Sequence, residues 1–208
     1  MTEQSNLGDQ TSRTGWIKLG YDRTIWIPCP PGFRADMTRE QWAGGFAQAW
    51  WEASGAKFGQ RELQNFEHAL VYAHENIYGH LPCHLALLHV PDVYSGVLPV
   101  CFGIWQASGD RDSQLRMLVH ADDPAAMEPP AVEEVRTPAL GTGLRCIYYQ
   151  RESHGSGVLA SLSYAWRSEE YDTDVRMFTA AADLGRLQGA LGDIEALTQV
   201  ITMIPRAQ

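Results

Sequence analysis

The sequence predicts an α+β fold in which an antiparallel sheet of about six to eight strands packs with two helices from the N-terminal half and one C-terminal amphipathic helix. Two observations predict this fold. Apolar residues recur at helical spacing in residues 38–79 and again from residue 183, whereas the segments between them are short, rich in branched and aromatic residues, and bounded by turn residues. The 208 residues are enough for one core, so we expect a disordered tail over residues 1–14 and a single globular domain over residues 15–208.

The N-terminal part of the domain predicts a strand pair followed by two helices. Residues 16–28 contain two short apolar runs that flank turn residues, as a hairpin or strand pair requires. Thr38 lies three residues before Gln41, the spacing of a capping box, which predicts a helix over residues 38–54. A second helix follows, and Gly79 stands where a left-handed C-terminal cap would end it.

Six segments after residue 80 have the length and composition of strands, and short turns between them predict an antiparallel sheet. The first is apolar on both faces, so we expect it at the centre of the sheet. Residues 122–134 contain three prolines and five carboxylates and are predicted to form a solvated loop at a sheet edge. Asp183 caps the last helix, whose leucines and isoleucines share one side. The six segments are PCHLALLHV, GVLPVCFGIWQ, QLRMLVH, GLRCIYYQR, GVLASLSYAWR and DVRMFTAAA.

The distribution of charge and apolar residues disfavours two classes of partner. The net charge is -9, and the basic residues include only two lysines and form no cluster, which disfavours binding to nucleic acid. The acidity also disfavours anionic membrane surfaces, and no apolar run approaches the roughly 20 residues that cross a bilayer. Because the N-terminal residues lack the features of a secretory signal, we expect a cytoplasmic protein.

The spacing of cysteines and histidines indicates no metal site, and we expect no cofactor. His74 and Glu75 begin like a zinc-protease helix, but the next histidine, His80, follows too late for both imidazoles to bind one ion. The four cysteines are widely spaced without a C-x-x-C pair, so we expect reduced thiols that act as small core residues. They are Cys29, Cys83, Cys101 and Cys146.

Two polar turns could be taken as catalytic or phosphate-binding motifs, but turn chemistry explains both. Ser156 lies close to His154, yet the segment joins two predicted strands and lacks the G-x-S-x-G elbow of hydrolases. Gly141-Thr142-Gly143 precedes a strand, whereas a dinucleotide site requires a glycine-rich turn that opens a helix. We therefore assign no catalytic residue.

The seven tryptophans and eight tyrosines exceed what a core of this size needs, and both residue types are favoured where an apolar surface meets a polar rim. Trp51 lies about 100° around the first helix from Trp50, which belongs to the core face. Tyr148 and Tyr149 must point to opposite sides of their strand. We take Trp51, Tyr148 and Tyr149 as a candidate interaction surface; the alternative is that helices cover both faces of the sheet.

The stretch RMFTAAADLGRLQGALGDIEALTQVITMIP, together with the order of the predicted elements, resembles the Mog1/PsbP-like fold. The resemblance covers most of residues 15–204 and implies a sheet with helices on both faces. The helix pair in residues 38–79 is longer than that family leads us to expect. Members of the family are mainly non-catalytic binding or assembly factors, which the resemblance extends to this chain.

Two functions follow from these observations. The first is a cytosolic, non-enzymatic interaction or assembly module that binds a protein partner, either a second copy or another protein, through its aromatic surface. The second is a small-molecule-binding protein or enzyme with a pocket between the sheet and the helices. The side chains expected to reach into such a pocket are His84, His89, His120 and Arg145.

Overall fold

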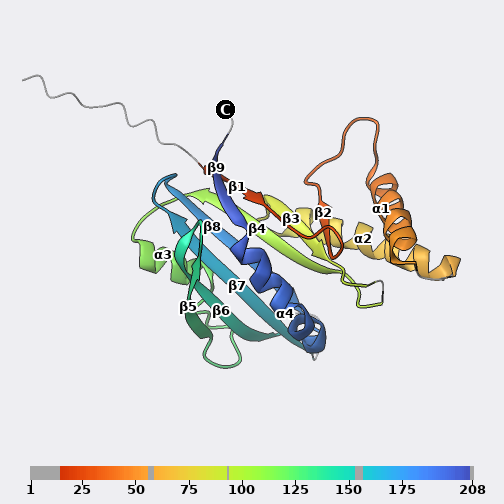
Figure 1. Cartoon of the computed structure of the whole chain (residues 1–208). Coiled ribbons are helices and arrows are strands. Elements are labelled where there is room, and N and C mark those ends of the chain that lie inside the picture. Colours follow the sequence, from red (N-terminus) through yellow and green to blue (C-terminus); the bar gives the residue numbers. More distant parts are fainter. Residues whose placement is uncertain (1–14, 56–58, 93, 153–156, 207–208) are drawn as a thin grey trace, which may run out of the picture.

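The computed structural model describes residues 15–55, 59–92, 94–152 and 157–206, which form an α+β fold built on a seven-stranded antiparallel sheet (Figure 1). The strands of this sheet lie in the order β2-β3-β4-β8-β7-β6-β5, while β1 and β9 form a separate two-stranded sheet. The predicted tail and the turn that contains Ser156 lie outside the described residues. The strands are β1 (Gly15–Leu19), β2 (Trp26–Cys29), β3 (Leu85–His89), β4 (Leu98–Gln106), β5 (Ala131–Thr137), β6 (Gly141–Arg151), β7 (Val158–Ser168), β8 (Thr173–Ala181) and β9 (Ile201–Pro205).

The two N-terminal helices are confirmed. In the capping box of the first helix, the backbone N–H of Gln41 donates to the Thr38 hydroxyl at 3.1 Å, and the Thr38 N–H donates to the Gln41 side chain at 2.7 Å. The second helix runs through Gly79, so the expected stop at this glycine is wrong; Leu81 leaves the helix with an extended backbone instead. The helices are α1 (Arg39–Ser54), α2 (Gln60–His80), α3 (Arg111–Leu118) and α4 (Leu184–Gln199).

The third predicted strand, QLRMLVH, is wrong, because this segment forms α3 and the turn that follows it. Asp110 caps α3 by accepting a hydrogen bond from the backbone of Ser113 at 2.9 Å. Leu115 and Leu118, one helical turn apart, are buried, whereas Met117 is 60% exposed. Alternation of apolar residues over seven positions therefore fitted a strand and a short helix equally well, and packing against the sheet decided for the helix.

The N-terminal strands do not pair with each other, so the predicted hairpin is wrong. β1 pairs with β9, with Leu19 opposite Ile201, while β2 pairs with β3, with Trp26 opposite His89. The sequence analysis did not anticipate β9, which follows α4 directly, and it assigned the first residues of β5 to a loop. Each of these pairings joins segments that are far apart in the sequence, which a local pattern cannot encode.

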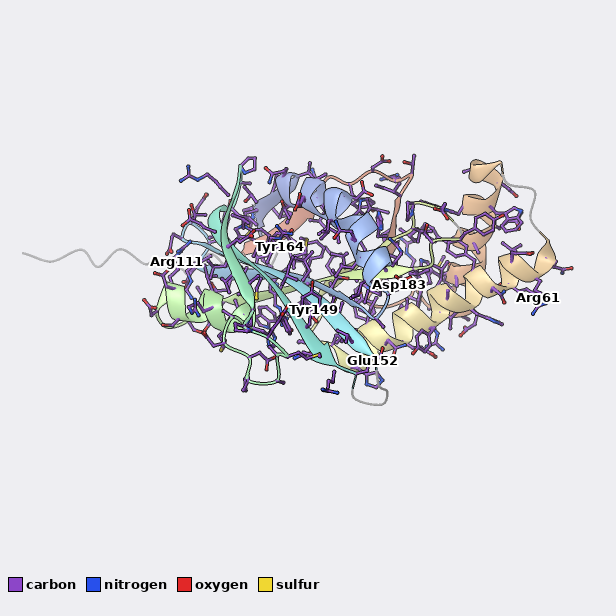
Figure 2. The ribbon with its side chains drawn as sticks, turned by 90° about the horizontal axis from the view of Figure 1, so that it is seen from below. Arg61, Arg111, Tyr149, Glu152, Tyr164 and Asp183 are labelled. Atoms are coloured by element: carbon purple, nitrogen blue, oxygen red, sulfur yellow. The ribbon has the colours of Figure 1, made fainter. Side chains whose placement is uncertain are left out.

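Helices cover both faces of the main sheet (Figure 2). On one face, here the α4 face, α4 packs on the sheet through Leu187, Ile194 and Leu197. On the opposite face, the α3 face, α2 packs over β2 to β4 and α3 packs over β6 and β7. Figure 1 shows that the helices of the α3 face lie at opposite ends of the sheet, with α1 and α2 at one end and α3 at the other.

The strand expected at the centre, β3, lies next to the edge strand β2, and β8 occupies the central position. β3 is nevertheless apolar on both faces, because Leu87 packs in the core under α4 and Leu88 packs in the core under α2. None of the helices in the described part of the chain combines the length and the hydropathy that crossing a lipid bilayer requires.

Candidate functional site

The central strand β8 is open on one face only. On the α4 face, Val175 and Met177 are buried. On the α3 face, Arg176 and Phe178 are half-buried and Ala180 is exposed. Helix α2 packs against β4 and helix α3 against β6 and β7, on the two sides of β8. We call Arg176, Phe178 and Ala180 the β8 strip; it is a partly uncovered surface at the middle of the sheet.

Arg176 is held in a defined orientation within this strip. Its guanidinium carbon lies 4.4 Å from the centroid of the Phe178 ring, a cation–π contact, and its Nη2 donates to the Ser163 hydroxyl at 3.2 Å. The Nε atom is buried without an acceptor. The residues opposite Arg176 on the two neighbouring strands are small, Gly103 on β4 and Ala165 on β7. The guanidinium is therefore fixed by one ring and one hydroxyl.

Arg167, also on the α3 face, is an arginine whose charge and hydrogen-bond donors have partners within the protein. It donates two hydrogen bonds to the Asp174 carboxylate, at 2.7 and 2.9 Å, and two more to the carbonyls of Ser108 and Gly109. Asp174 is 0% exposed, so the pair is closed off from water. Arg176 has one neutral acceptor where Arg167 has a carboxylate and two carbonyls.

The other half-buried arginines of the described residues also have carboxylates nearby. Arg39 contacts Glu75 at 2.8 Å and Arg111 contacts Asp112 at 3.0 Å. The structure records no ion pair of Arg176 within the described residues, and burial lowers the pKa of its guanidinium. Arg145 contacts Glu133 and Glu195, whereas Arg186 has no ion pair among the described residues but has Asp92, Asp183 and Asp193 as electrostatic neighbours.

Besides the Ser163 hydroxyl, Tyr148 and His120 are electrostatic neighbours of the guanidinium. Ser161, Ser163 and Tyr148 are at most 6% exposed, and burial raises the pKa of Tyr148 against a smaller lowering by the Ser161 hydroxyl. His120, in the turn after α3, stacks on the Tyr148 ring with a centroid distance of 5.7 Å. Burial and, next, the positive charge of Arg176 lower the pKa of His120, so its imidazole is neutral at pH 7. We call Arg176, Ser161, Ser163, Tyr148 and His120 the Arg176 cluster.

The left-handed backbone of His120, with φ of 60°, turns the chain at the end of α3 and places the imidazole beside Tyr148. Asp123 lies 3.6 Å from His120 Nδ1 and accepts a hydrogen bond from Gln150 at 2.9 Å. A shallow surface cavity of about 550 Å³ adjoins this loop and is lined by Gln150, Arg151 and residues 125–127. The turn after α3 thus forms one wall of the cluster.

The three residues of the predicted interaction surface lie in three different environments. Tyr148 and Tyr149 point to opposite faces, as predicted. Tyr148 is only 5% exposed because α3 covers it, so its ring does not form the surface that the sequence predicts. Tyr149 is half-buried and packs against the core on the α4 face. Trp51 is half-buried on α1.

The four residues of the predicted pocket do not come together. His84 accepts a hydrogen bond from the Ile104 backbone at 3.1 Å and lies between two tryptophan rings. Arg145 joins β6 to α4 and β5 through its two carboxylate contacts. His120 belongs to the Arg176 cluster on the other face of the sheet. His89 is 0% exposed and lies under α4.

His89 has two partners on α4. Its Nε2 lies 2.9 Å from the Asp193 carboxylate, and Nη1 of Arg186 lies 3.0 Å from its Nδ1. Because an arginine can only donate, Nδ1 accepts and Nε2 carries the proton that is donated to Asp193. Burial lowers the pKa of His89. This histidine is therefore neutral, and its hydrogen bonds to Asp193 and Arg186 link α4 to β3.

The cysteines are free, and three of them are buried. Burial raises the pKa of Cys29 to about 12, so this thiol is protonated at neutral pH. Cys29 and Cys101 lie in the core under α2, with the half-buried Cys83 packed against it. Within the described residues, no group of three or more histidines, cysteines and carboxylates is arranged to hold a metal ion.

The sequence analysis missed Arg176, Ser161 and Ser163. A signal was available, because Ser161 and Ser163 stand at alternate positions of one strand and Arg176 lies between the apolar Val175 and Met177 of the next, where the three share one face. The pairing of those strands, which brings Ser163 opposite Phe178, could not be read from either segment alone.

Comparison with known proteins shows the fold and no family. No protein-family model matches the chain, and no curated protein matches it. Among solved structures, the chain is similar to LpqN of Mycobacterium tuberculosis, described as involved in cell envelope biogenesis, with a TM-score of 0.52 and 6% identity over 95% of this chain and 88% of that chain. At this identity the likeness shows a shared fold alone, and the Mog1/PsbP-like fold stays a prediction of the sequence.

Proposed function

We propose that this protein is a non-enzymatic interaction module that binds another protein on the β8 strip. One observation carries the proposal: the central strand of a sheet with helices on both faces remains partly open, and the open positions hold an arginine and a phenylalanine. Arginine and aromatic side chains are enriched at the centres of protein interfaces, where they contribute most of the binding energy.

The surroundings of the strip support a protein partner. The chain carries a net charge of -9, while the strip presents a guanidinium that has no ion pair in the part of the chain that the structure describes. An acidic group of the partner would complement the positive charge of Arg176. The acidic surface elsewhere on this chain would disfavour other orientations of that partner. Phe178 and Ala180 would supply apolar area beside that contact.

We extend the proposal to a cytoplasmic location. The support is the presence of four free cysteines, which suits a reducing compartment. The envelope role in the description of LpqN is a property of that protein, and 6% identity gives no reason to transfer it. The alternative of a small-molecule pocket has less support, because His84, His89, His120 and Arg145 have separate sets of partners and do not line one cavity together among the described residues.

Photo-crosslinking tests the proposal. A photoreactive amino acid is introduced at Ala180 in the strip and, as a matched control, at Gln188, an exposed residue of α4 on the other face. We expect an adduct with one other protein from position 180 only. With that protein purified, Ala180→Trp should weaken binding at least about ten-fold and Gln188→Trp should leave it unchanged.

Three results would overturn the proposal. The first is an adduct that forms equally from both positions. The second is a dissociation constant that Ala180→Trp does not change. The third is an adduct of two copies of this chain, because the strip would then be a self-association surface and not a site for a different protein.

A further inference from the structure

We propose that Arg176 is the receptor for a single carboxylate, the side chain of an aspartate or glutamate that the partner protein inserts into the β8 strip. This inference rests on the proposed function and names the chemistry of the contact. It places the specificity of the site in the Arg176 cluster and not in Phe178 or Ala180.

Folding leaves the charge of Arg176 without an ion pair among the described residues. Within the described residues, the Ser163 hydroxyl is the acceptor that the guanidinium of Arg176 uses, at 3.2 Å, and Nε is buried with none. Buried charges in proteins are ordinarily paired, as Arg167 is with Asp174 in the neighbouring part of the same face. A carboxylate is the acceptor that matches the planar donor fork of arginine.

The orientation of the Arg176 guanidinium is fixed before any ligand binds. The Phe178 ring holds the guanidinium plane from one side at 4.4 Å. The residues opposite Arg176 on both neighbouring strands, Gly103 and Ala165, have no side chain long enough to reach the guanidinium, and the Trp105 indole lies over Gly103 as a wall. An orientation fixed before binding reduces the entropy lost when the ligand arrives.

The charges near Arg176 favour a carboxylate over a phosphate as the ligand. Within the Arg176 cluster, Arg176 supplies the positive charge, since burial and the charge of Arg176 lower the pKa of His120 and leave its imidazole neutral at pH 7. The carboxylate of Asp123, 3.6 Å from His120 Nδ1 and an electrostatic neighbour of Tyr148, would repel a dianion more than a monoanion. One positive charge with hydroxyl donors suits one negative charge.

Nuclear magnetic resonance of the arginine side chains provides a direct test. The Nε–H resonance of Arg176 is assigned from its loss in Arg176→Lys, and that of Arg167 serves as an internal control because its guanidinium is already paired. The protein is titrated with phenylacetate and with phenylacetamide, which has the same shape and no charge. We expect a saturable shift of the Arg176 resonance with phenylacetate, a dissociation constant at least about ten-fold higher for phenylacetamide, and no shift of Arg167.

Equal responses to phenylacetate and phenylacetamide, or no response of Arg176, would overturn the inference. A response to inorganic phosphate that is tighter than the response to phenylacetate would overturn the choice of a carboxylate. In the complex with the crosslinked partner, replacing the partner's contacting acid by its amide should weaken binding about ten-fold, and should have no further effect when this chain carries Arg176→Gln. Additive losses in that double-mutant cycle would show that the two groups do not meet.

The failures of the two proposals are distinguishable. If Ala180 crosslinks a partner whose binding does not depend on Arg176, the interaction module stands and the carboxylate contact is overturned. If phenylacetate binds at Arg176 but no partner is found at Ala180, the interaction module and the partner-borne carboxylate are both overturned, and the site is one for a free small carboxylate.

Discussion

If Arg176 serves to bind a partner, its partly desolvated charge should lower the stability of the unbound protein. Removing that charge by substitution measures the effect. We expect Arg176→Met to raise the free energy of unfolding. Arg176 loses part of its hydration on folding, as the burial that lowers its pKa indicates. Its compensation within the described residues is one hydrogen bond to a hydroxyl at 3.2 Å and one cation–π contact. A methionine of similar length would keep the packing on Phe178 without carrying a charge.

The magnitude follows from these opposing contributions. Desolvation of a fully buried ion costs several kcal/mol, and the half-burial of Arg176 reduces that cost. A hydrogen bond from a charged donor returns about 1.5 to 3 kcal/mol, and a cation–π contact about 0.5 to 2 kcal/mol. Replacing buried ionic groups by apolar ones commonly stabilises proteins by about 1 to 4 kcal/mol. We therefore expect a gain of about 1 kcal/mol, equivalent to about 2 to 4 °C in Tm for a chain of this size.

Urea unfolding followed by tryptophan fluorescence measures this change, since the chain has seven tryptophans. The matched control is Arg167→Met, which leaves the fully buried Asp174 carboxylate unpaired and should cost about 3 to 5 kcal/mol. A loss of more than about 1 kcal/mol in Arg176→Met, with an unchanged denaturant slope, would refute the reasoning. Arg176 would then be an ordinary stabilising residue of the sheet.

Three further predictions concern stability. Thr38→Ala removes the capping box of α1 and should cost about 1 kcal/mol in urea unfolding, whereas an unchanged midpoint would mean that the cap contributes nothing. Gly143→Ala places a methyl group against the Ala165 carbonyl and the Trp166 indole and should cost about 1 to 3 kcal/mol in the same assay; wild-type stability would contradict this contact. Burial holds the folded pKa of His89 below its unfolded value of about 6.5, so stability should be full above that pH and fall as the pH drops through it. Urea midpoints at pH 7.5 and 5.5 test this, and His89→Gln should show a smaller loss between them; an identical loss would exclude His89 as a contributor.

Sequence reasoning succeeded where the cause of a structure lies within a few neighbouring residues. The Thr38 and Gln41 pair predicted the start of α1, and the recurrence of leucine and isoleucine after Asp183 predicted α4. Alternate residues of a strand share one face, and Leu162, Tyr164 and Trp166 of β7 are accordingly all buried on the α4 face. The same local reasoning gave the α+β fold class with one large antiparallel sheet.

Only the tertiary structure decided how these elements meet. Whether the segment around Leu115 was strand or helix, and whether β1 paired with β2 or β9, depended on contacts with distant parts of the chain. The Arg176 cluster combines β8, β7, β6 and the turn after α3, so no single segment encodes it. Composition shows 16 basic and 25 acidic residues, but which of those charges folding leaves without a partner depends on the three-dimensional surroundings of each one.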